Sequence, residues 1–207
     1  MRRLFLLRTF WVTLAVGVAV NLGWHFYRIW LPRFLTVDLK FSQRDVQWVL
    51  AGFFLAADLG SMAAGYLTRR LSRAGLSVER SRKVVLLGAA LLCLLSAPAA
   101  LAMTPWVTLP LLFVVGAAAM GGLPLFFALS QEVSPRHTAL CLGLCGSAAW
   151  VVIAVLQPPI GALVDRIGTF VPSLIAIGFV PLLGALVGLL WPEPESNGLA
   201  LPDPAAQ

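Results

Sequence analysis

The chain has 207 residues, of which 59% are hydrophobic and only 12% are charged. Soluble domains carry about 25% charged residues, so this composition excludes a water-soluble globular protein. The net charge of +6 does not indicate a nucleic-acid-binding protein, because the basic residues lie in short connections beside apolar stretches. We therefore expect an integral membrane protein.

Six apolar stretches are long enough to cross a bilayer, which takes a helix of about 20 residues. They cover residues 9–31, 46–68, 84–103, 106–130, 138–164 and 169–191. Each is expected to be a helix, because the strands of a membrane barrel are about half as long and alternate in polarity. The sequence thus predicts an all-α membrane protein of six transmembrane helices over residues 1–191. A disordered cytoplasmic tail is expected at residues 192–207.

The first stretch carries polar side chains at helical spacing. Asn21, Trp24, His25 and Arg28 are separated by three or four residues, which predicts one shared helix face. A polar face in a membrane helix points to a cavity or to a neighbouring helix. We therefore take Asn21, Trp24 and His25 as candidate substrate-binding residues, with Arg28 at the outer mouth of the path. The alternative is that this face anchors the helix at the interface, where Arg28 extends its charge to water.

The second stretch is rich in small residues. Pairs of small residues four apart are Ala56 and Gly60, Ser61 and Gly65, and, in the fourth stretch, Ala117 and Gly121. Small residues at this spacing let two helix backbones approach closely, so the pattern predicts a packed bundle.

Asp58 is a carboxylate in the middle of the second stretch. Such a group is costly in a membrane and usually faces protein or water with a partner. One interpretation makes Asp58, Arg69 and Arg82 a set of gating or proton-coupling residues. The other is a structural pair of Asp58 with Arg69 or Arg82.

Basic residues concentrate in the connection between the second and third stretches. One side of the membrane is expected to hold Arg2, Arg3, Arg8, Arg69, Arg70, Arg73, Arg80, Arg82, Lys83 and Arg136, and the other Arg33, Lys40, Arg44 and Arg166. Lys and Arg are retained on the cytoplasmic side. This asymmetry predicts that both termini are cytoplasmic. We expect the membrane to be the inner (plasma) membrane of a bacterium.

Prolines interrupt helical hydrogen bonding within the later stretches. Pro110 and Pro124 lie in the fourth, and Pro158 and Pro159 in the fifth. Each removes a helical hydrogen bond, and a membrane tolerates this where neighbours or a cavity satisfy the freed carbonyl group. Two short acid–base pairs are also expected at span ends, Asp165 with Arg166 and Glu132 with Arg136.

No constellation of residues indicates catalysis. Cys93, Cys141 and Cys145 lie within apolar stretches without metal-ligand spacing, which is typical of packing residues. Ser147 lacks the turn of an intramembrane serine protease, and there is no phosphate-binding glycine loop. We expect no enzymatic activity, no metal and no cofactor.

Several motifs resemble the major facilitator superfamily. They are Trp30-Leu31-Pro32-Arg33-Phe34-Leu35, Ala57-Asp58-Leu59-Gly60-Ser61, Gly65-Tyr66-Leu67, Ser81-Arg82-Lys83, Ser130-Gln131-Glu132-Val133-Ser134-Pro135-Arg136-His137 and Gly161-Ala162-Leu163-Val164-Asp165-Arg166-Ile167-Gly168. More narrowly, the set is similar to the anion:cation symporter family, which includes hexuronate, galactonate and sialic acid transporters. The resemblance extends to Trp191 and matches spans seven to twelve of that twelve-span fold.

The resemblance implies further site residues. In sugar-acid members this part of the fold supplies aromatic and hydrogen-bonding contacts to substrate, which would here be Phe127, Ser147, Trp150 and Gln157; Phe127 and its neighbour Phe126 would alternatively pack against helices or lipid. The loop from Gly65 to Arg70 resembles the family's cytoplasmic gate loop. It has Thr68 where the stronger form of the motif has an aspartate.

The function that the resemblance implies is transport of small organic anions, such as hexuronates or hexonates, by alternating access. The chain would act as the C-terminal half of a split or truncated transporter, or as a half-unit that forms a parallel homodimer. Its partners would be the lipid bilayer, the organic anion and an N-terminal half-transporter or second copy, with no nucleic acid. The alternative is a non-transporting membrane remnant or assembly partner.

Overall fold

The computed structural model describes residues 6–133 and 138–190, and these residues form α-helices without any strand. The helices are α1 (Arg8–Val37), α2 (Gln43–Arg73), α3 (Val78–Cys93), α4 (Ser96–Ala102), α5 (Pro105–Val133), α6 (Thr138–Ile167) and α7 (Val171–Leu189). Within the described part of the chain, six segments are long and apolar enough to cross a membrane, and α3 and α4 together form one of them. The predicted all-α bundle of six such helices is confirmed. The predicted tail at residues 192–207 lies outside the described residues.

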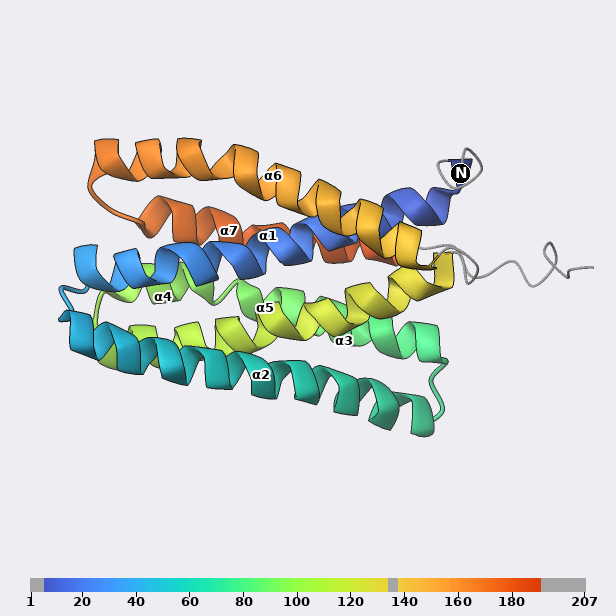
Figure 1. Ribbon diagram of the computed structural model, residues 1–207. Coiled ribbons are helices and arrows are strands. Elements are labelled where there is room, and N and C mark those ends of the chain that lie inside the picture. The colour runs from blue at the N-terminus through green and yellow to red at the C-terminus, as the bar shows by residue number, and fades with distance from the viewer. Residues whose placement is uncertain (1–5, 134–137, 191–207) are drawn as a thin grey trace, which may run out of the picture.

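Successive crossings of the bundle run in opposite directions (Figure 1). The start of α1, the α2–α3 connection and the end of α7 lie together at one end, on the right of the figure. We call this the basic end, because the α2–α3 region there carries Arg69, Arg70, Arg73, Arg80, Arg82 and Lys83. The α1–α2 connection and the α6–α7 turn lie at the opposite end.

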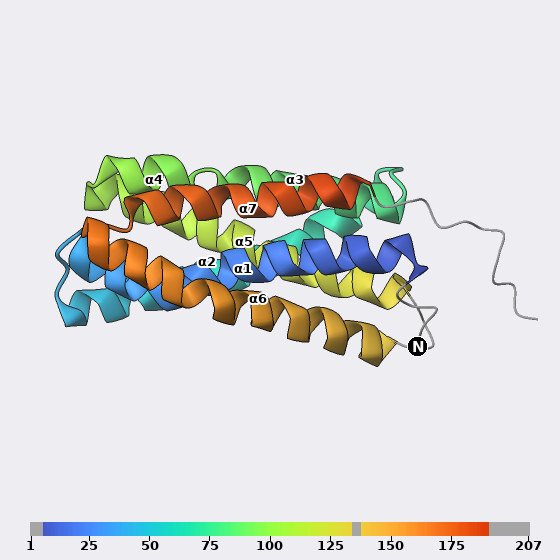
Figure 2. The same cartoon turned by 90° about the horizontal axis from the view of Figure 1, so that it is seen from above.

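Helix α1 runs through the middle of the bundle. Figure 2 places α3, α4 and α7 on one side of it and α6 on the other. In the most apolar 18-residue stretch of α1, 67% of the residues are buried, against 17% in α2 and 22% in α6. Helices α2 and α6 therefore lie at the edges of the unit with much of their surface uncovered.

The most extensive helix pair is α2 with α5, and small residues allow its close approach. A Cβ atom added to Gly60 would lie 2.5 Å from the carbonyl carbon of Ala117, and Gly121 lies next to the Gly60 carbonyl oxygen. These contacts confirm the packing role expected of Gly60, Ala117 and Gly121. Gly65 is different, because nothing lies within 4 Å of the position its Cβ would take.

The third crossing is not one continuous helix. It breaks at Leu94 and Leu95, between α3 and α4. Pro98 explains the break, because it has no N–H to donate to the carbonyl group of Leu94 and its ring would crowd that group. Helices α5 and α6 instead continue through Pro110, Pro124, Pro158 and Pro159.

Candidate substrate-facing wall

The polar side chains within the crossings divide into buried and uncovered ones. On the α4 side, the hydroxyl of Ser96 is buried and donates to the carbonyl oxygen of Leu174 over 2.6 Å. On α2 and α6, Asp58 and Ser147 are exposed. An exposed carboxylate in a crossing is expected to face water or protein and not lipid. We call the surface that carries Asn21, His25, Asp58, Ser147 and Trp150, on helices α1, α2 and α6, the open wall.

His25 lies at the centre of the open wall, beneath Trp150 of α6. Its ring is 4.3 Å from the Trp150 ring, centroid to centroid, at an interplanar angle of 42°. His25 is 6% exposed and its Nδ1 atom has no hydrogen-bond partner among the described residues. Trp150 is 53% exposed, so its outer face is free to contact another molecule. The pair places a hydrogen-bonding nitrogen directly behind an exposed indole ring.

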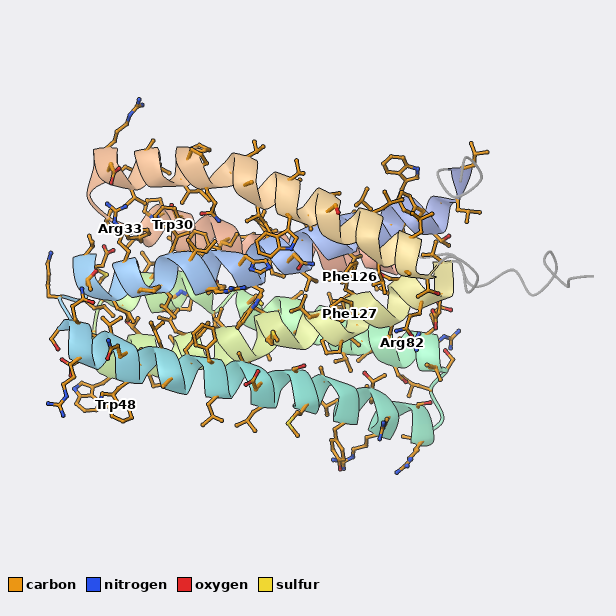
Figure 3. The ribbon with its side chains drawn as sticks, viewed as in Figure 1. Trp30, Arg33, Trp48, Arg82, Phe126 and Phe127 are labelled. Carbon is orange, nitrogen blue, oxygen red and sulfur yellow. The ribbon has the colours of Figure 1, made fainter. Side chains whose placement is uncertain are left out.

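A second contact joins α1 to α6 nearer the opposite end. The indole N–H of Trp30 donates to Oε1 of Gln157 over 2.5 Å, and Figure 3 shows Trp30 between these helices. Because an indole nitrogen only donates, the atom facing it must be the amide oxygen of Gln157. The Gln157 NH2 group supplies two further donors beside this bond.

Trp24 does not lie beside His25. It is buried against α2, stacked on Phe53 at 6.1 Å and edge-on to Phe54 at 5.9 Å. Consecutive helical residues point about 100° apart, so one turns to α2 and the next to α6. The expectation that these residues form a single face is wrong for Trp24.

The remaining polar residues of α1 behave differently from one another. Asn21 is half-buried, and its Nδ2 donates to the carbonyl oxygen of Gly17 in the same helix over 2.8 Å. Arg28 is exposed.

The two phenylalanines beside Pro124 also separate. Phe126 is buried, with its ring against Gly17 of α1, where an added Cβ would lie 3.0 Å from the Phe126 Cζ. Phe127 is 47% exposed, and both residues lie between α1 and α2 in the view of Figure 3. Of the pair, only Phe127 can contact a molecule outside the unit.

Asp58 lies on the part of α2 that faces α1. It follows Phe54 by four residues and therefore shares its helix face, and the Phe54 ring contacts Trp24. Asp58 has no ion pair within the described residues. The expected structural pair with Arg69 is wrong, because eleven residues of helix separate the two by about 16 Å.

Arg82 pairs with Glu132 and so joins α3 to α5 at the basic end. The expected pair of Arg82 with Asp58 is therefore wrong. The expected partner of Glu132, Arg136, lies outside the described residues. Arg69 is exposed on α2. Of the three candidate gating residues, Arg69 and Arg82 thus lie together at the basic end, whereas Asp58 lies apart from them.

The opposite end is held by contacts that the sequence did not indicate. Arg33 pairs with Asp165 over 2.8 Å, so the expected pair of Asp165 with Arg166 is wrong. The carboxylate of Asp38 accepts from the hydroxyl of Thr169 and from the backbone N–H of Phe170. These residues are more than 120 positions apart, and no local pattern connects them. Within the described residues no cluster of His, Cys, Asp and Glu side chains could hold a metal ion.

The sequence of the chain is similar to those of several known proteins. Residues 1–144 match the model of the Major Facilitator Superfamily. The hexuronate transporters of Escherichia coli K12 and O157:H7 are each 30% identical over 186 residues, covering 89% of this chain and 42% of theirs. The uncharacterized MFS-type transporter YfnC of Bacillus subtilis is 30% identical over 152 residues, covering 72% of this chain and 34% of its own. The chain thus spans about two fifths or less of the length of these relatives.

Proposed function

The chain belongs to the major facilitator superfamily, and on this premise we propose that it transports small organic anions of the sugar-acid class. Membership in a transporter family also supports the expectation that the chain is not an enzyme. The similarity to two hexuronate transporters supports the substrate class and the anion:cation symporter type.

The observation that carries the proposal is the His25–Trp150 pair on the open wall. A sugar acid has apolar C–H faces and a rim of hydroxyl groups. The exposed indole face of Trp150 can pack against the C–H face of the sugar. The Nδ1 atom of His25, which has no hydrogen-bond partner among the described residues, can bond to a hydroxyl group once Trp150 moves aside. Phe127, Ser147 and the amide NH2 group of Gln157 extend the same set of contacts along the wall.

The open wall needs a second surface to enclose a substrate. Two cavities of about 380 and 390 Å³ in the unit are lined by neither His25, Trp150 nor Asp58. We propose that a second six-helix unit covers the wall, either a different sequence or a parallel copy of this one. Transport would then follow from rocking of the two units around a site at the middle of the membrane.

The orientation is part of the proposal. The basic end would lie in the cytoplasm, at the inner membrane of a bacterium, because Lys and Arg are retained on that side. In this orientation both termini are cytoplasmic.

A second function is an assembly partner, or a remnant, that does not transport. It is favoured by hydrogen bonds that polar residues on or beside the open wall make within the unit. These bonds join Asn21 to Gly17 and Trp30 to Gln157. Such a protein would retain the wall for pairing without binding a substrate.

The test is uptake of labelled hexuronate and hexonate into vesicles that contain the purified chain, with and without a pH gradient, beside thermal unfolding with these ligands. Trp150→Ala is compared with Trp11→Ala, which removes an equally exposed indole at the α1–α7 groove, away from the wall. We expect Trp150→Ala to weaken ligand binding about tenfold, equivalent to about 1.4 kcal/mol, and Trp11→Ala to leave it unchanged.

The two readouts separate the functions. Uptake supports an independent transporter, and stabilisation without uptake supports a half-unit that needs another partner. If neither ligand is taken up or stabilises the chain, the sugar-acid proposal is wrong and the assembly-partner function takes its place.

A further inference from the structure

A cavity of about 390 Å³ lies at the basic end between α2, α3 and α5, away from the open wall. Arg69 and Arg73 of α2 and Arg82 of α3 line it, together with Ser72. Arg69 and Arg73 are four residues apart and therefore extend from the same face of α2. Three arginines from two helices thus line one hollow.

The cavity has an excess of positive charge. None of the residues that line it is acidic. Arg82 is compensated by Glu132, whereas Arg69 and Arg73 have no ion pair among the described residues. A guanidinium group binds a phosphate through two parallel hydrogen bonds, and this pairing is stronger than that of a neutral donor. The unpaired charges therefore favour an anion, and a phosphate matches the fork of each arginine.

The other side of the cavity is apolar. Pro124, Leu125 and Ala128 of α5 and Val78 of α3 form this side. A freely soluble phosphate gains nothing from such a surface, whereas the glycerol and first methylene groups of a phospholipid do. The position also agrees, because basic pockets between helices at the cytoplasmic face of a membrane bind lipid headgroups.

From these observations we propose that this cavity binds the phosphodiester headgroup of an anionic phospholipid. Arg69 and Arg73 hold the phosphate, the Ser72 hydroxyl donates to it, and the α5 side contacts the glycerol. The proposal is independent of the transported substrate.

The test uses the purified full chain in detergent, titrated with phosphatidylglycerol or with phosphatidylcholine. Bound lipid is counted by native mass spectrometry, and the midpoint of thermal unfolding is recorded. The double variant Arg69→Gln/Arg73→Gln is compared with Arg70→Gln/Arg80→Gln, which removes the same charge from exposed residues that do not line the cavity. We expect phosphatidylglycerol to bind the original chain and the control alike, and the cavity variant about tenfold more weakly.

Three outcomes overturn the proposal. Equal loss in both double variants means that diffuse surface charge binds the lipid. Equal binding of phosphatidylcholine means that no anionic headgroup is recognised. Inorganic phosphate that stabilises the chain as well as phosphatidylglycerol at equal concentration means that the site takes a soluble anion. If the double variant does not fold, Arg73→Lys takes its place, because it keeps the charge but removes the planar guanidinium group. We expect Arg73→Lys to weaken phosphatidylglycerol binding about threefold.

Discussion

A tyrosine hydroxyl deep in the apolar core illustrates how single residues hold this bundle together. The Tyr27 hydroxyl donates to Oγ of Ser96 over 2.9 Å, and the Ser96 hydroxyl donates onward to the carbonyl oxygen of Leu174. The chain of bonds joins α1, α4 and α7, and both side chains are buried. The Tyr27 hydroxyl therefore depends on Ser96, and the Ser96 hydroxyl depends on the Leu174 carbonyl group.

We predict that Ser96→Ala destabilises the chain by about 1–3 kcal/mol, because it leaves the Tyr27 hydroxyl without an acceptor. The measurement is the unfolding free energy in detergent. Ser130→Ala is the control, since among the described residues that buried serine donates only to Phe126 of its own helix, and its loss should have little effect. Tyr27→Phe in the Ser96→Ala background should add less than it does alone, and strict additivity would contradict the bond.

At the same scale, the sequence did not predict which candidate residues would be neighbours. His25 and Trp150 were both candidates, but nothing in the sequence indicated that they touch. Trp24 was placed with His25 and instead stacks on Phe53. The type of a residue indicates which interactions its side chain can make. Which residue it contacts depends on the rotation of each helix about its own axis.

At the scale of helices, Gly60 lies directly against the Ala117 backbone at the α2–α5 crossing. We predict that Gly60→Ala destabilises the bundle by about 1–3 kcal/mol, because the added methyl group would overlap the Ala117 backbone. Gly65→Ala, five residues along the same helix, should be neutral or stabilising because its Cβ meets nothing and alanine favours helix. Thermal unfolding of the two variants checks this, and equal midpoints would show that the crossing is not tight.

The start of α7 is capped from a distant part of the chain. Asp38 accepts from the N–H of Phe170, and we expect Asp38→Ala to cost about 1 kcal/mol and to speed amide exchange in the first turn of α7. Asp165→Ala is the comparison, because its pair with Arg33 is exposed and is worth about 0–1 kcal/mol. Unchanged exchange at Phe170 in Asp38→Ala would show that the carboxylate is not the cap.

The third crossing was only partly predicted from the sequence. The sequence predicted that this crossing exists but not that its helix breaks, although Pro98 causes the break. Helices α5 and α6, in contrast, continue through their prolines, as the predicted spans required. The effect of a proline depends on whether neighbouring helices hold the segment straight, and a sequence pattern does not contain that information.

At the scale of the whole molecule, the charge asymmetry predicts opposite sides for two loops. Helix α2 has 31 residues and is about 46 Å long, which exceeds the hydrocarbon core of about 30 Å, so Lys40 and Arg73 lie beyond opposite surfaces. We predict that an impermeant maleimide labels a cysteine at position 73 only in inside-out vesicles and one at position 40 only in right-side-out vesicles. The native cysteines, Cys93, Cys141 and Cys145, are buried and give little background. Labelling of both positions from one side would overturn the arrangement.

The sequence by itself determined that this chain is an all-α membrane protein with six crossings, because lipid accepts only long apolar segments whose backbone bonds are internal. It also carried the motifs that mark the superfamily. Only the tertiary structure decided that His25 lies under Trp150, that Arg82 pairs with Glu132, and that three arginines line one cavity at the basic end. The physical reason is that each helix obeys local rules, whereas its rotation and its level against a neighbouring helix follow from packing between different helices.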